Sequence, residues 1–192
     1  PYTTLFRSRD LGGDGIGTMA YDCCPRLQLS GTAGGETVSG EAWMDHQWGD
    51  YGWMRAPNKG SALLGWDWIG INLDDGRDFI VMVHRDMRTR DPVARFAVMF
   101  DDTGTQIVDT VTITGLGEWF SHETMADYPV RCRIEIPELS AVFEFEPLAE
   151  NQEISVFGLI NTIWEGAGTI RGTLGGSAVS GRARLELHGY GY

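Results

Sequence analysis

The sequence predicts an all-β fold and, within that class, an antiparallel barrel rather than a sandwich. Short apolar segments follow one another along the chain, with glycine and aspartate turns between them. No stretch repeats apolar residues at helical spacing over more than a couple of turns. Two central segments, 63–73 and 79–87, carry large apolar residues on both faces, which favours a closed sheet around a lined interior.

Each predicted strand is bounded by a turn signal or defined by alternation. The segment 63–73 ends at Asp74-Asp75-Gly76, a hairpin signal. Segments 130–137 and 140–147 alternate charged and apolar side chains, as half-buried strands do. The stretch 115–129 is less regular. About nine or ten strands are expected, from candidate segments at 25–32, 37–48, 63–73, 79–87, 94–100, 105–114, 130–137, 140–147, 153–166, 168–174 and 180–190.

Composition excludes several classes of function. The net charge of −12 and the pI of about 4.6 argue against nucleic-acid binding, which needs a basic face. No window approaches the ~18 consecutive apolar residues of a membrane span. The three cysteines show no zinc-ligand spacing and are expected to be small buried thiols. No nucleotide-binding, hydrolase or metalloprotease motif occurs, so we expect neither a metal nor a cofactor.

The amino-terminal residues are expected to lie outside the fold. Residues 1–8 are what the end of a common sequencing adaptor encodes, and we interpret them as a scar of library preparation that packs against nothing. The glycine-rich residues 9–20 resemble a linker remnant, which leaves 21–192 for the barrel. A preceding domain or signal region is then expected to be missing. Periplasmic, secreted and cytoplasmic locations all stay open.

The segment 40–50 suggests a ligand pocket. Alternate side chains of a strand share a face, so Met44, His46 and Trp48 point one way, and Asp45 points the other way as a structural hydrogen-bond acceptor. Trp66 pairs with Trp68 by the same parity, as do Met82, His84 and Asp86. Histidine exchanges protons near neutral pH, and tryptophan faces stabilise positive charge. The competing interpretation is an ordinary aromatic core. His122 and His188 are expected to be structural or solvated.

The tryptophan-rich motifs resemble one known family. "PRLQLSGT", "VSGEAWMDHQWG", "GWDWIGINLDDGRDF", "WEGAGTIRG" and "SGRARLELHGY" are similar to the carotenoid 1,2-hydratase/AttH-like family of lipocalin-like proteins, over about residues 25–190. The resemblance implies two consecutive lipocalin-like barrels, of which this chain would hold the second. The missing first barrel would be its partner. The resemblance also implies proton-transfer chemistry on an apolar substrate: hydration, isomerisation or cyclisation.

The site residues follow partly from this resemblance. The family's His-x-Trp pair matches His46 and Trp48, whereas its Tyr-x-Asp pair has no clean match, because the following strand offers His84 and Asp86 instead. The predicted catalytic residues are therefore His46, Trp48, His84 and Asp86. The predicted substrate-binding residues are Met44, Trp66, Trp68, Met82 and Trp164. The alternative function is a non-catalytic module that binds lipids or other small hydrophobic molecules. A hydrophobic small molecule, isoprenoid-like or polyketide-like, is the expected ligand in both cases.

Overall fold

The computed structural model describes residues 4–6, 19–49, 64–157 and 161–191 of the chain. Contacts divide it into two compact units, residues 1–61 and residues 62–192, and each unit is an antiparallel β-structure. Among the described residues, the one helical element is a single 3₁₀ turn, η2 (Pro137–Leu139). No helix in the described part of the chain is long and apolar enough to cross a membrane.

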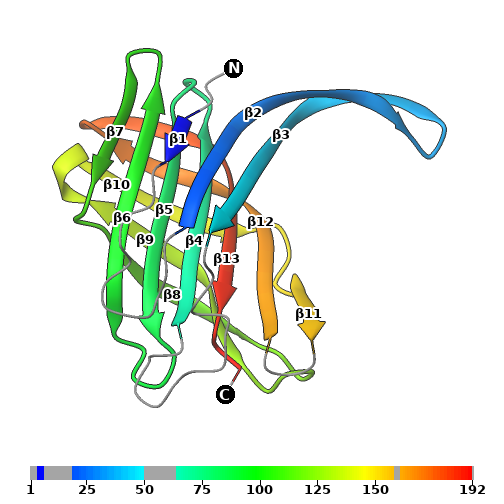
Figure 1. The fold of residues 1–192 in the computed structure, drawn as a ribbon, viewed down its shortest axis with the longest axis vertical. Helices are drawn as coiled ribbons and strands as arrows, with labels where there is room; N and C mark the ends of the chain where they lie inside the picture. Colours follow the sequence, from blue (N-terminus) through cyan, green and yellow to red (C-terminus); the bar gives the residue numbers. More distant parts are fainter. Residues whose placement is uncertain (1–3, 7–18, 50–63, 158–160, 192) are drawn as a thin grey trace. The chain divides into compact units, whose positions relative to one another are not determined.

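Unit 1 is a three-stranded sheet dominated by a long β-ribbon (Figure 1). Strands β2 (Met19–Ala33) and β3 (Glu36–Gly49) pair along their length, with one register shift between Cys24 and Leu27. Strand β1 (Thr4–Phe6) pairs with residues 21–23 of β2. The expectation that residues 1–8 pack against nothing is therefore wrong for Thr4–Phe6, because an extended segment beside an unpaired strand edge gains its backbone hydrogen bonds. Residues 1–3, 7 and 8 lie outside the described residues.

Unit 2 is a single sheet of ten antiparallel strands. Along the sheet the order is β7-β6-β5-β4-β13-β12-β10-β9-β8, and β11 pairs with the first part of β12. The strands are β4 (Leu64–Leu73), β5 (Asp78–Asp86), β6 (Pro92–Asp101), β7 (Gly104–Val108), β8 (Thr112–Phe120), β9 (Asp127–Ile136), β10 (Ala141–Pro147), β11 (Glu153–Phe157), β12 (Asn161–Leu174) and β13 (Ser177–His188).

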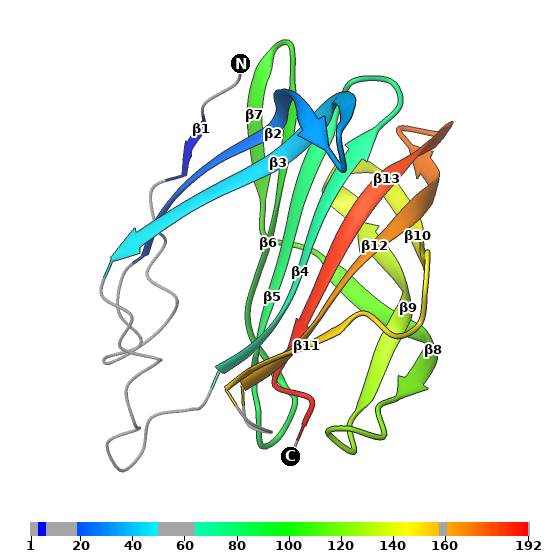
Figure 2. The same ribbon diagram turned by 90° about the vertical axis from the view of Figure 1, so that its right-hand side faces the viewer.

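The connection between β7 and β8 curls this sheet. These two strands stand at opposite ends of the strand order, yet only residues 109–111 separate them in sequence. An extended chain advances at most about 3.5 Å per residue, so the two edges approach within roughly 14 Å there. Figure 2 shows the resulting curl. The predicted strand at 105–114 is thus two strands, and the predicted strand at 168–174 is the continuation of β12.

The concave side of the curled sheet holds the core. Alternation on β9 places Cys132, Ile134 and Ile136 inside, and it leaves Arg131 and Arg133 outside in ion pairs with glutamates. Side chains on both faces of the sheet are buried at its centre, where nearly every residue of β4 and β5 is buried. The prediction of two apolar faces in these strands is confirmed. The three cysteines are buried free thiols, as expected.

Candidate functional site

Three aromatic side chains form a row on the convex face of unit 2. Trp66 on β4 lies opposite His84 on β5 and opposite His188 on β13 in the strand register. The ring of His188 stacks on that of Trp66 at a centroid distance of 4.0 Å and an interplanar angle of 18°. The indole Nε1 of Trp66 donates to Glu186, two residues before His188 on the same strand. The indole therefore has one imidazole on the neighbouring strand on each side.

Trp68 and Met82 extend this row along the same face. They are direct cross-strand partners, and both are buried, with exposed fractions of 3% and 7%. The Trp68 ring lies over Gly70, since a Cβ at that position would come within 2.6 Å of the indole. Four of the residues predicted from sequence, Trp66, Trp68, Met82 and His84, are therefore neighbours on one apolar surface. We call these four together with His188 the histidine–tryptophan row.

Both histidines of the row are held in the neutral form. Burial lowers the pKa of His84 to about 4, and burial together with the charge of Arg85 lowers the pKa of His188 to about 4. Within the described part of the chain, neither Nδ1 atom has a hydrogen-bond partner, although both atoms are buried. An unpaired buried polar atom costs free energy that a bound hydroxyl or water would recover. The row can therefore form a hydrogen bond with a ligand through these two atoms.

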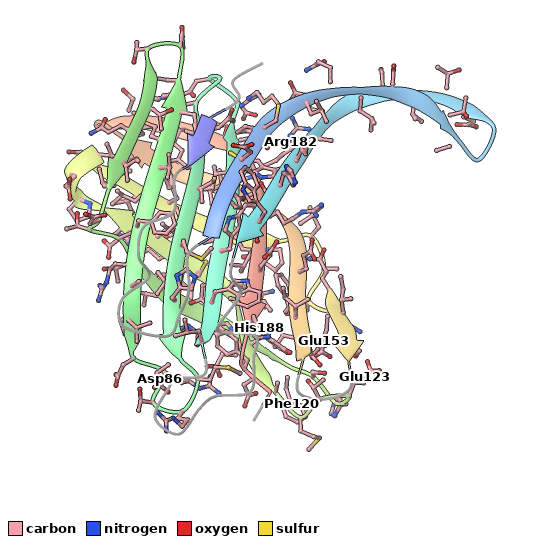
Figure 3. All side chains as sticks on the ribbon, viewed as in Figure 1. Asp86, Phe120, Glu123, Glu153, Arg182 and His188 are labelled. Carbon is pink, nitrogen blue, oxygen red and sulfur yellow. The ribbon has the colours of Figure 1, made fainter. Side chains whose placement is uncertain are left out.

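Asp86 lies at the end of β5, and its side chain binds residues of the following turn. Its carboxylate accepts hydrogen bonds from the backbone N–H groups of Arg88 and Thr89, and it forms an ion pair with the Arg88 guanidinium. These bonds, those of Arg88 first, lower the pKa of Asp86 below its usual value. Figure 3 labels Asp86 and His188 at the same end of the sheet. An ionised carboxylate can orient a partner, but it is a poor proton donor.

Trp164 lies on the opposite face of the sheet from the row. It sits on β12, fully buried in the concave core, and its Nε1 donates to the backbone carbonyl of Glu150 at 2.7 Å. As at Trp68, the ring lies over a glycine two residues along the strand, here Gly166. The structure thus separates Trp164 from Trp66 and Trp68, which lie on the other face of the same sheet.

The predicted His46–Trp48 pair is in unit 1. The two rings are tilted against each other at a centroid distance of 4.9 Å, and both side chains are exposed, as is Met44 on the same face. On the other face, Trp43 Nε1 donates to Asp45 at 2.6 Å, which matches the predicted structural role of Asp45. The convergence of this pair with the row of unit 2 stays a prediction.

Sequence reasoning missed two features. His188 was expected to be structural or solvated, yet it completes the row, because β13 inserts beside β4. The second feature is a buried ion pair on the concave side between Asp67 and Arg85, with Tyr190 donating to the same carboxylate. Strand parity places Asp67 and Arg85 on the inner face, which was the available signal. Among the described residues, no group of three histidine, cysteine or carboxylate side chains is placed to hold a metal ion.

Comparison with known proteins places the chain among relatives of known fold. The AttH-like family model matches residues 13–190, and no curated protein matches. A crystal structure of a candidate AttH from Nitrosomonas europaea is 29% identical, with a TM-score of 0.73, and the match covers 98% of this chain and 60% of that one. Kievitone hydratase from Nectria haematococca is 19% identical, with a TM-score of 0.71, over 96% of this chain and 55% of that one.

The family model and the two solved structures match nearly the same part of this chain. The chain spans a little over half the length of both solved structures, whereas they account for nearly all of its own residues. The family model likewise runs through both units, from the residues before β2 to the end of β13. The chain belongs to the AttH-like family.

Proposed function

We propose that the chain binds an apolar, isoprenoid-like molecule on the histidine–tryptophan row and takes part in its hydration. The observation that carries the proposal is the pair of neutral histidines, His84 and His188, flanking Trp66 with both Nδ1 atoms unpaired. A surface of this kind combines a large apolar contact with two convergent polar atoms, which is the usual composition of a small-molecule site.

The chemistry of hydration fits these groups. A proton adds to one carbon of an alkene, water adds to the other, and the water then loses a proton. A neutral imidazole with a pKa of about 4, such as His84, can hold the attacking water and accept its proton in the transition state. The faces of Trp66 and Trp68 would stabilise the positive charge that develops on carbon. In this scheme the acid that protonates carbon is a group outside the row.

The comparisons support this proposal at the level of family and fold. The family match and the shared fold with a kievitone hydratase favour a hydratase-like lipocalin fold for this chain. Isomerisation and cyclisation use the same proton-transfer groups and stay within the proposal. The matched structures are longer than this chain, and we propose that an additional lipocalin-like barrel completes the site.

The alternative is a binding module without catalysis. The observation that favours it is Asp86, whose carboxylate is tied to the Arg88 turn and whose pKa is lowered. Carbon protonation needs a strong acid in a dry site. If no other group supplies that acid, the row retains its apolar contacts and its unpaired nitrogens, and it binds a ligand without converting it.

One experiment tests both functions. Farnesol would displace the fluorescent apolar probe anilinonaphthalene sulfonate from the chain, and incorporation of heavy-oxygen water would report hydration. We expect His84→Gln to weaken farnesol binding by roughly tenfold, the worth of one hydrogen bond to a buried polar atom. The control is His122→Gln, because His122 is exposed and contacts only the ring of Phe120 among the aromatic pairs of the described residues.

The outcomes separate the possibilities. Displacement with oxygen incorporation supports hydration, and displacement without it supports the binding module. Equal affinity in the wild type, His84→Gln and His122→Gln would mean that farnesol binds elsewhere, and the proposal for the row would be wrong.

A further inference from the structure

A second group of polar side chains lies on the concave side of unit 2, across the sheet from the row. Arg85 Nη2 donates to Asp67 Oδ1 at 2.6 Å, and Arg85 Nε donates to Oδ2 at 3.2 Å. The Tyr190 hydroxyl donates to the same carboxylate at 2.9 Å. Asp67, Arg85 and Tyr190 are 5%, 6% and 8% exposed. With Arg90 they form what we call the inner arginine cluster.

Two guanidinium groups of the cluster lie close to the same phenol ring. The Cζ atom of Arg85 lies 4.3 Å from the centroid of the Tyr190 ring, and that of Arg90 lies 5.0 Å from it. Arg90 is exposed and belongs to the turn between β5 and β6, where its φ of 64° is in the left-handed region. That conformation is unfavourable for a residue other than glycine or asparagine.

The cluster has an unused donor and an unbalanced charge. Arg85 uses Nε and Nη2 on Asp67, and its Nη1 is buried without a hydrogen-bond partner within the described residues. Among the described residues, the cluster holds two guanidinium groups, those of Arg85 and Arg90, and one carboxylate, that of Asp67. Within the cluster as defined, the positive groups outnumber the carboxylates by one, in a chain whose net charge is −12.

We propose that the inner arginine cluster binds the carboxylate of an apolar acid. A single negative charge balances the cluster, and a planar carboxylate suits the free edge of one guanidinium together with a second guanidinium. Tyr190 does not compete for this anion, because its hydroxyl proton is already donated to Asp67. This site goes beyond the proposed function, since it lies on the other face of the sheet from His84 and Trp66.

An apolar acid fits the end of the sheet where the cluster lies. Strands β5, β8 and β13 all end there, and Figure 3 labels Asp86, Phe120 and His188 at this end, whereas Arg182 lies at the other. The β8–β9 turn at the same end exposes two large apolar side chains, Phe120 at 37% and Met125 at 71%. Arg90 is exposed whereas Arg85 is buried, so Arg90 is the group of the cluster that an incoming carboxylate meets first.

The test compares laurate with dodecanol, which have the same chain length and differ in charge. Calorimetry with the full chain should give roughly tenfold tighter binding for laurate, the size expected for charge-assisted hydrogen bonds. Arg90→Gln should remove most of that preference. Arg88→Gln is the matched control, because Arg88 is in the same turn but its side chain is 71% exposed and paired with Asp86.

A direct readout on Arg85 avoids the risk that its replacement unfolds the chain. The NMR signal of the Arg85 guanidinium should shift when laurate is added and should stay in place with dodecanol. Equal affinities for laurate and dodecanol would overturn the proposal. So would a lower melting temperature of Arg90→Gln with unchanged laurate affinity, because the cluster would then balance its charge against a carboxylate of the chain itself.

Discussion

Replacing Arg85 by methionine tests how the concave side of unit 2 tolerates its buried charge. In the wild type the Asp67 carboxylate receives two hydrogen bonds from Arg85 and one from Tyr190 while remaining 5% exposed. Arg85→Met removes the opposite charge and leaves the carboxylate buried. Breaking such a pair costs about 3–5 kcal/mol. For a chain of roughly 150–250 residues, each kcal/mol shifts the melting temperature by about 2–4 °C, so a fall of roughly 6–20 °C is expected.

The stability difference between the wild type and Arg85→Met should depend on pH, and the pKa of Asp67 gives the direction of that dependence. Burial is the largest influence on the pKa of Asp67 and raises it, while Arg85 and Tyr190 oppose that increase. Without Arg85 the pKa of Asp67 rises further. A carboxyl group whose pKa is higher in the folded chain than in the unfolded chain destabilises the fold while it is ionised. This cost disappears as the pH falls through the folded pKa. The stability difference between the wild type and Arg85→Met should therefore narrow on acidification.

Thermal unfolding followed by circular dichroism at about pH 8 and about pH 5 measures this difference. Arg88→Met is the control and should stay within about 0.5 kcal/mol of the wild type, because Arg88 is a surface residue. Adding Asp67→Asn to Arg85→Met should recover part of the loss, since the uncompensated charge is gone. A loss that is independent of pH and unchanged by Asp67→Asn would refute the reasoning and would point to lost packing alone.

Two further predictions concern the sheet itself. His84→Phe should flatten the dependence of the unfolding free energy on pH between about 4 and 6.5, because burial lowers the pKa of His84 from 6.5 to about 4 and the unfolded chain binds the extra proton in that window. Urea unfolding across this range checks it, and an unchanged slope would contradict it. Gly172→Ala should lower stability by about 1–3 kcal/mol, since a Cβ there would come 1.9 Å from the backbone oxygen of Val142. Gly40→Ala, with open space around the new methyl, should change the denaturation midpoint little, and equal losses in both variants would exclude the steric explanation.

Alternation along the sequence was enough to predict the all-β class and the faces of individual strands. The pattern at 130–137 became β9 with its apolar side inside, and the two-sided apolar segments became β4 and β5, buried on both faces. Parity also grouped Trp66 with Trp68 and Met82 with His84. These features are local, because successive side chains of any strand point to opposite faces whatever the strand pairs with.

The pairing of strands was decided by the tertiary structure alone. His188 reaches Trp66 because β13 lies between β4 and β12, and Tyr190 reaches Asp67 across 123 residues of sequence. Nothing in the alternation of β4 distinguishes β13 from any other strand as its neighbour. Trp164 also could not be placed from the sequence. Like Trp68 it lies two residues before a glycine, but its position in the strand register directs its side chain toward the core. Which strands are neighbours depends on the free energy of burying all the apolar faces at once, and no single segment carries that information.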